Sequence, residues 1–124
     1  MYRVAITGIG IVSCLGNDIN TVGAALRAGT SGIIVDPLRT ELGFRSPLTG
    51  QIRNFDETIL SRKQRKSMPD FAVWAYATAQ DALSMAGLAA EDISNEQTGL
   101  IYGCDSSCIA AIEQVDALRA AGET

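Results

Sequence analysis

A continuous apolar run near the start of the chain constrains its fold more than any other feature. Residues 4–12 read Val-Ala-Ile-Thr-Gly-Ile-Gly-Ile-Val, with many β-branched side chains and no polar alternation. Such a run is typical of a strand buried on both faces, as in a parallel sheet covered by helices. Residues 98–103, Thr-Gly-Leu-Ile-Tyr-Gly, predict a second buried strand. The order strand, helix, loop, helix, strand, helix therefore indicates an α/β fold.

Caps and apolar spacing predict the helices between and after these strands. One helix begins at Asn17 or Asp18 and runs to about Ala28, with Gly29 as a left-handed stop. The alanine-rich segment 69–86 is the second, because alanine has the highest helix propensity. The other expected elements are extended pieces at 31–35 and 51–53 within loops, a short helix over 56–66 capped by Asp56, a polar connection over 89–97, and a last helix after Ser106 or Ser107.

The composition excludes several kinds of chemistry within this chain. No histidine occurs among its 124 residues, which rules out a Ser-His-Asp triad, a Cys-His dyad and a histidine-ligated metal site. Cys104 and Cys108 have no second cysteine pair with which to form a zinc site, so no metal is expected. A net charge of −4 argues against a nucleic-acid partner, because domains that bind nucleic acids are usually basic.

The chain shows no sign of secretion or membrane insertion. Met1 to Arg3 lead directly into the strand-like run, so no signal peptide is expected. No apolar run reaches about 18 residues, the length that would span a bilayer. Three cysteines without a pairing pattern are typical of a reduced compartment, so we expect a cytoplasmic protein.

Two glycines at the end of the first predicted strand allow a nucleotide-binding hypothesis. Gly8 and Gly10 stand where a dinucleotide fingerprint would begin, and Asp36 is an acid of the kind that binds ribose. Ser13 replaces the third glycine of that fingerprint. The other interpretation is that the glycines let strand and helix pack closely. A nucleotide-binding oxidoreductase domain therefore stays open as an alternative function, with micromolar NAD(P) binding as its test.

Cys108 and a basic run are the other candidate functional features. Cys108 lies near the predicted start of the last helix, where unpaired N–H groups stabilise a thiolate, but it also lies on an apolar stripe. Cys14 and Cys104 are expected to be structural. The run Arg62-Lys63-Gln64-Arg65-Lys66 places four cations in five residues of an acidic chain. It is either a solvated helix end or a docking surface for an acidic partner.

Five blocks of the sequence, in a fixed order along the chain, carry a resemblance to a known family. They are Val4–Ser13 with Gly16-Asn17, Leu26–Ile33, Leu42–Ser46 with Gly50, Ser61–Leu88, and Gly99–Gly103. In this order they resemble the β-ketoacyl-acyl-carrier-protein synthases, condensing enzymes of the thiolase-like superfamily, and the third block is most similar to the type I branch. The resemblance implies that residues 1–124 are the N-terminal portion of a layered α-β-α-β-α domain.

The resemblance also implies an acyltransferase activity. Enzymes of this family perform a decarboxylative Claisen condensation of an acyl thioester with malonyl-carrier protein, in fatty acid or polyketide-type biosynthesis, and need no dissociable cofactor. Their nucleophilic Cys and two His come further along than Thr124, so no catalytic residue is expected in this segment and Cys108 becomes a minor alternative. A chain-length-factor-like partner, which lacks the Cys nucleophile, is the alternative function within the same fold.

Partners and binding residues follow from the same resemblance. Arg62, Lys63 and Lys66 match basic residues that contact the acidic acyl carrier protein, and Arg65 in the same run matches less clearly. Ser106 matches the position that gates the depth of the acyl pocket, although residues 104–108 replace several glycines of the family. The expected assembly is a homodimer, or a heterodimer with a ketosynthase-like subunit.

Overall fold

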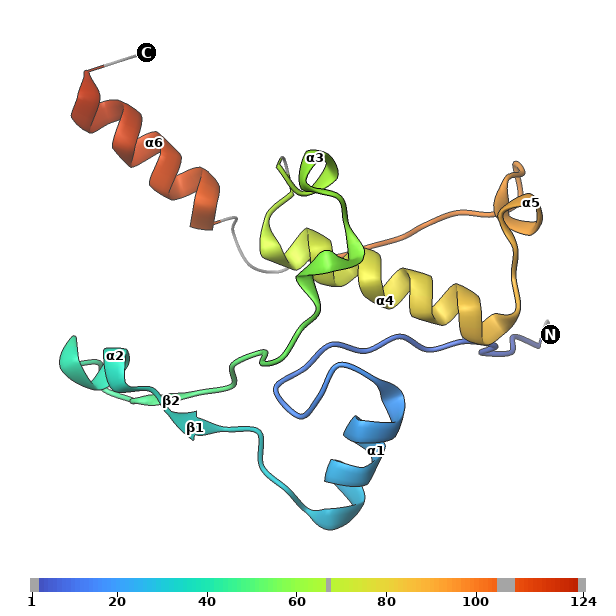
Figure 1. Cartoon of the computed structure of the whole chain (residues 1–124), viewed down its shortest axis with the longest axis horizontal. Coiled ribbons are helices and arrows are strands. Elements are labelled where there is room, and N and C mark those ends of the chain that lie inside the picture. Colours follow the sequence, from blue (N-terminus) through green and yellow to red (C-terminus); the bar gives the residue numbers. More distant parts are fainter. Residues whose placement is uncertain (1–2, 67, 105–108, 123–124) are drawn as a thin grey trace.

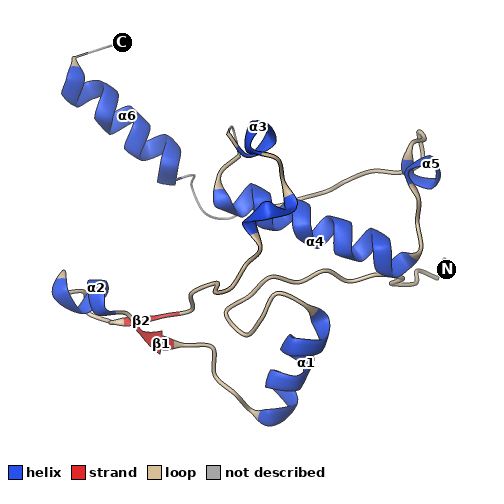
Figure 2. Ribbon diagram, in the orientation of Figure 1, coloured by secondary structure: helices blue, strands red, loops and turns tan. Residues whose placement is uncertain are grey.

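Helix α4 (Asp70–Ala86) is the longest helix described, and the first segment of the chain runs beside it (Figure 1). The computed structural model describes residues 3–66, 68–104 and 109–122. Within these residues, no helix has both the length and the apolar character that a membrane span requires. The other elements are α1 (Ile19–Ala28), β1 (Ile34–Val35), α2 (Pro37–Glu41), β2 (Leu48–Thr49), the 3₁₀ turn η1 (Glu57–Ile59), α3 (Arg62–Arg65), α5 (Ala90–Ile93) and α6 (Ile109–Ala121) (Figure 2).

Two glycines set how closely the first segment approaches α4. A Cβ at Gly8 would overlap the carbonyl oxygen of Ala82, and a Cβ at Gly10 would overlap that of Thr78. Only glycine permits two backbones to come this close. The expectation that these glycines permit close packing against a helix is therefore confirmed.

The prediction that residues 4–12 and 98–103 form buried strands of one sheet is wrong for the described structure. Neither segment is paired as a strand with another described residue. Val4 is 92% exposed and Ile101 is 97% exposed. Extended backbone becomes a strand only when a neighbour satisfies its N–H and C=O groups. The apolar composition identified segments suited to strands, but it could not supply that neighbour.

The first predicted helix and both of its caps are confirmed as α1. The Asp18 carboxylate accepts hydrogen bonds from the N–H groups of Asn20 and Thr21, both at 2.9 Å, and from the Thr21 hydroxyl at 2.6 Å. These bonds, that of the Thr21 hydroxyl most of all, hold the pKa of Asp18 below its usual value. Gly29 ends the helix with a φ of 66°, a left-handed conformation that favours glycine.

A small antiparallel hairpin follows α1. β1 pairs with β2, and Ile34 lies opposite Thr49. The extended piece expected over 31–35 is thus confirmed at its last two residues. The prediction of a strand at 51–53 is wrong. The strand that pairs with β1 lies earlier in the chain, at β2. Cross-strand pairing, rather than local composition, decided its position.

Short helices were missed or merged where apolar periodicity is poor. The Asp36 carboxylate accepts from the Leu38 N–H at 2.9 Å and starts α2 within an expected loop. The single helix expected over 56–66 is instead η1 and α3, because Leu60 and Ser61 between them have extended backbones. Likewise, α5 forms within the expected polar connection. Such one-turn helices depend on local caps, which apolar spacing does not reveal.

The last two predicted helices are present. α4 matches the segment expected over 69–86 and ends at Gly87 in a left-handed conformation with a φ of 67°. α6 matches the last predicted helix, and the residues expected to cap it, Ser106 and Ser107, lie outside the described residues. In Figure 1, α6 stands apart from α4.

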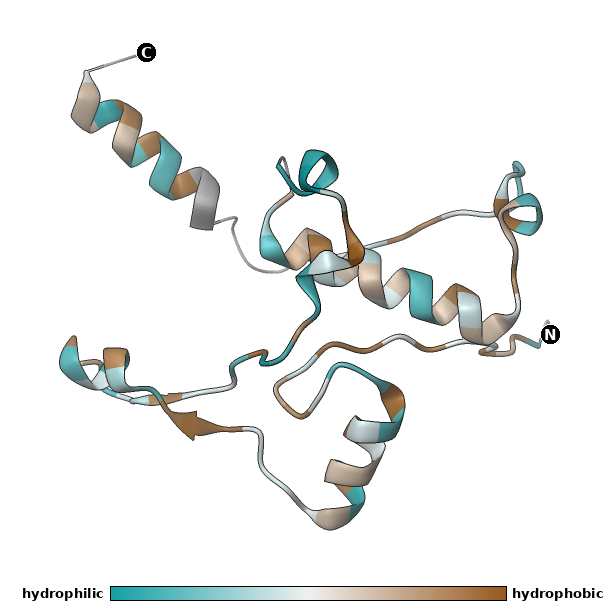
Figure 3. Ribbon diagram, viewed as in Figure 1, coloured by the Kyte–Doolittle hydropathy of each residue, from teal (hydrophilic) through white to brown (hydrophobic). Residues whose placement is uncertain are grey.

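Few of the described apolar side chains are buried. Val22, Leu60 and Val73 are the buried ones. The accessible surface is 10334 Å², whereas a compact monomer of this mass exposes about 6,400 Å². Figure 3 shows apolar positions in brown along the extended segments and on α6. The chain therefore presents much apolar surface that suits contact with additional protein.

Candidate functional site

Helix α3 and its C-cap residue carry the basic run. Arg62, Lys63 and Lys66 are exposed, and no described residue forms an ion pair or side-chain hydrogen bond with them. We term these three residues the α3 cationic patch, and α3 is teal, hence hydrophilic, in Figure 3. Because no described carboxylate neutralises them, their charges are available to attract an acidic partner.

Local hydrogen bonds form α3 and the turn before it. Ser61 Oγ accepts from the Gln64 N–H at 3.4 Å, and Gln64 Oε1 accepts from the Ser61 N–H at 3.1 Å, which is a capping box. In η1, the Asp56 carboxylate accepts from the Thr58 hydroxyl at 2.6 Å and the Thr58 N–H at 2.8 Å. These bonds, the hydroxyl first, hold the pKa of Asp56 below its usual value.

Arg65 differs from the other cations of the run. Its side chain is half-buried, with 31% exposed. Its guanidinium donates to the Met68 carbonyl oxygen and forms an ion pair with the carboxylate of Asp70, the first residue of α4. Of the four cations expected to dock a carrier protein, three face outward and one is engaged within the chain.

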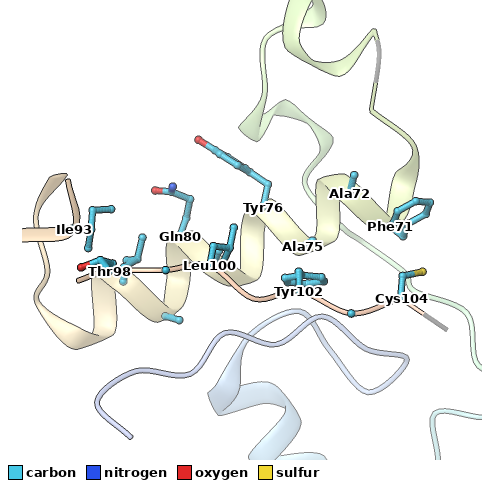
Figure 4. Close-up of a pocket in the computed structure, with 15 residues that line it drawn as sticks. Phe71, Ala72, Ala75, Tyr76, Gln80, Ile93, Thr98, Leu100, Tyr102 and Cys104 are labelled. Carbon is cyan, nitrogen blue, oxygen red and sulfur yellow. The ribbon is translucent and has the colours of Figure 1, made fainter. Parts of the chain in front are cut away.

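An apolar groove of about 900 Å³ lies between α4 and residues 98–104 (Figure 4). On the α4 side, Ala72, Ala75 and Ala79 line it; their spacing places them on one helix face, and their small side chains leave the space open. Tyr102 lies on the opposite wall. The sequence signal for the groove is the run of alanines in residues 69–86, from which a helix was predicted but no groove.

The other sequence candidates are placed as follows. Ser106 and Cys108, the expected pocket gate and the minor nucleophile candidate, lie outside the described residues. Cys14 is half-buried, and a Cβ at Gly32 would lie 2.6 Å from its sulfur, which fits the packing role expected of it. Cys104 lines the groove. Within the described part of the chain, no group of three His, Cys, Asp or Glu side chains is placed to hold a metal ion.

Known proteins are similar to this chain in sequence. Residues 1–123 match the sequence model of the family described as β-ketoacyl synthase, N-terminal domain. The 3-oxoacyl-[acyl-carrier-protein] synthase 1 of Haemophilus influenzae is 41% identical over 103 residues, which are 83% of this chain and 25% of that protein. The synthase 1 of Escherichia coli K12 is 36% identical over 104 residues, or 83% of this chain and 26% of that protein.

A solved structure shows the same architecture. A β-ketoacyl synthase from Burkholderia phymatum superimposes with a TM-score of 0.81 and 30% identity, covering 99% of this chain and 31% of that one. The fold is therefore the N-terminal part of a thiolase-like α/β domain, as expected. The chain belongs to the β-ketoacyl synthase family. It spans about a quarter of the length of the curated relatives it matches.

Family membership also decides between the two classes of function that the sequence left open. The family accounts for nearly the whole chain. In addition, the backbone of α4 occupies the space beside Gly8 and Gly10, where the dinucleotide hypothesis placed a cofactor. The nucleotide-binding oxidoreductase hypothesis is therefore set aside.

Proposed function

We propose that this chain is the N-terminal portion of a 3-oxoacyl-[acyl-carrier-protein] synthase and that its α3 cationic patch docks acyl carrier protein. The observation that carries the docking proposal is the patch itself: three exposed cations, unpaired among the described residues, in a chain of net charge −4. The names of the relatives support an acyl-carrier-protein substrate.

In the whole protein, the proposed reaction is a decarboxylative Claisen condensation. A carbon–carbon bond forms between the acyl carbonyl carbon and the α-carbon of a malonyl thioester. The bond from that α-carbon to the malonyl carboxyl group breaks and releases CO₂, and the C–S bond of the acyl thioester breaks so that the thiolate that carried the acyl group leaves. The segment contains no histidine. We propose that it supplies scaffold and docking surface, while the nucleophilic Cys and two His lie elsewhere in the protein.

The patch would act mainly on the encounter with the carrier protein. Exposed ion pairs contribute about 0.2–1 kcal/mol each, so three of them give a modest affinity. Their attraction extends over a Debye length of about 8 Å at physiological salt and therefore weakens as salt is added. Charged residues at the rim of an interface chiefly raise the association rate and orient the partner.

The exposed apolar surfaces support a wider proposal about the domain. Residues 4–12 and 99–103 do not pair as strands with any other described residue, and the α4 groove is open. We propose that the remainder of the synthase supplies the missing strand partners and covers the groove. We further propose a cytoplasmic homodimer, or a heterodimer with a ketosynthase-like subunit, acting in fatty acid or polyketide-type biosynthesis.

Charge reversal in the full-length protein tests the docking proposal. The variant Arg62→Glu/Lys63→Glu/Lys66→Glu should weaken carrier-protein binding by about tenfold or more at low salt. The matched control, Arg27→Glu/Arg45→Glu/Arg53→Glu, changes net charge equally at three exposed arginines outside the patch. It should bind clearly better than the patch variant. Unchanged affinity of the patch variant at both low and moderate salt would refute the proposal.

A further inference from the structure

Arg65 joins two helices through one side chain. Its backbone carbonyl accepts from the Met68 N–H at 3.0 Å, and its guanidinium donates back to the Met68 carbonyl. The same guanidinium pairs with the Asp70 carboxylate, so the end of α3 and the start of α4 are linked at two acceptors. A planar guanidinium with donors on both outer nitrogens suits such a two-acceptor contact.

The position of α4 is set by its length and its packing, whereas α3 is too short to hold its own orientation. α4 has 17 residues, and its backbone packs directly on Gly8 and Gly10. α3 has four residues, its capping box is internal to it, and it buries no side chain. A helix of one turn has little stability of its own. Its direction relative to α4 therefore depends on contacts such as the one that Arg65 makes.

The start of α4 needs this contact as well. Its N-cap, Pro69, makes no side-chain hydrogen bond to the helix. Asp70 supplies the acidic group that a helix N-terminus favours, and Arg65 holds that carboxylate in place. The half-buried side chain of Arg65 also lines a small polar pocket with Asn54 and Trp74, and none of the other three cations of the run lines that pocket.

We infer that Arg65 is a positioning residue: by pairing with Asp70 it orients the α3 cationic patch on α4, and it does not itself contact the carrier protein. This inference rests on the proposed docking function. It separates Arg65 from Arg62, Lys63 and Lys66, with which it shares charge and sequence position.

Two conservative variants of the full-length protein distinguish positioning from direct contact. Arg65→Lys keeps the positive charge but loses the planar fork, so a direct electrostatic contact predicts unchanged affinity and positioning predicts a loss. Asp70→Asn removes a negative charge close to the patch, so direct electrostatics predict equal or tighter carrier-protein binding. Positioning predicts weaker binding in both cases.

We expect each variant to raise KM for the carrier-protein-bound acyl substrate by about threefold, because a partly exposed ion pair is a modest contact. kcat at saturating substrate should be retained. The double variant Arg65→Lys/Asp70→Asn should be no worse than either single variant, because both remove the same contact. Arg27→Lys, the same substitution on α1, serves as the matched control and should leave KM unchanged.

A Lys63→Glu variant in the same assay separates the two proposals. If Lys63→Glu binds poorly while Arg65→Lys and Asp70→Asn bind as the parent does, docking stands and the positioning inference is overturned. Tighter binding by Asp70→Asn with an unchanged Arg65→Lys also overturns it. If Lys63→Glu binds normally, the docking function fails; a non-additive effect of Arg65 and Asp70 on thermal unfolding would then still establish the link between the helices.

Discussion

Asn17 and Arg53 join two segments that are 36 residues apart, because the Asn17 side-chain amide donates to the Arg53 carbonyl oxygen at 2.7 Å. Asn17 Oδ1 is buried and has no hydrogen-bond partner within the described part of the chain. This bond connects the turn that leads into α1 with the loop that leads to η1 and α3. The direction of the bond matters, since only the amide group of asparagine can donate to a carbonyl.

Asn17→Asp should therefore destabilise the protein. The carboxylate cannot donate, so the bond to the exposed Arg53 carbonyl is lost, and the net contribution of one such hydrogen bond is about 0.5–1.5 kcal/mol. Urea unfolding of the full-length protein measures the change. The control is Asn20→Asp, which adds an acid to the exposed first turn of α1, where negative charge is favoured. Equal stability of the two variants would contradict the role given to Asn17.

Ser61→Ala should loosen α3. It removes the oxygen that accepts from the Gln64 N–H, and loss of an N-cap costs about 0.5–2 kcal/mol. Hydrogen exchange of the Gln64 amide should accelerate accordingly. Ser84→Ala, an exposed position within α4, is the control and should leave that exchange rate unchanged. An unaltered Gln64 rate in Ser61→Ala would mean that the capping box does not hold the helix.

Gly8→Ala and Gly10→Ala should each prevent the first segment from packing on α4. The added methyl would meet the Ala82 or Thr78 carbonyl oxygen, and overpacking of this kind typically costs about 1–3 kcal/mol. Gly23→Ala is the matched control: its methyl would meet only the flexible end of Arg27 at 3.5 Å, and alanine favours the helix. Thermal unfolding should therefore show destabilisation at positions 8 and 10 and none at 23.

The cap of α1 should weaken in acid. The folded-state pKa of Asp18 is lowered below the ordinary value of 3.8, chiefly by the Thr21 hydroxyl. A lowered pKa means that the carboxylate stabilises the folded state above pH 3.8, and that this contribution is lost as pH falls through the folded pKa. NMR titration of the Asp18 carboxyl carbon should show a midpoint below 3.8 that rises in Thr21→Val. An unchanged midpoint in that variant would exclude the hydroxyl as the cause.

The isolated 124-residue segment should show no condensing activity. It has no histidine, and the proposed catalytic residues lie elsewhere in the whole protein. Its accessible surface of 10334 Å² should also make it bind hydrophobic dyes more strongly than the full-length protein does. The measurement is product formation from acyl and malonyl thioesters of carrier protein. Turnover by the segment alone would overturn the proposed division of labour.

Helices that have capping residues in the sequence could be predicted. The contacts between elements that are far apart in the sequence could not. Asp18 and Gly29 bound α1 because capping bonds reach only two to four residues along the chain. β2 was misplaced because its position depends on pairing with β1. Similarly, the sequence shows four cations within five residues. It could not show that Arg65 pairs with Asp70 while the other three remain exposed.

What the sequence alone determined is what acts over short range: the family blocks, the helix caps, the glycines at 8 and 10, and the cationic run after Ser61. The tertiary structure decided which surfaces meet. It showed that α4 is the partner of Gly8 and Gly10, and that Arg65 faces inward. The physical reason is that backbone pairing and ion pairs between elements depend on distances in space, which residue order does not specify.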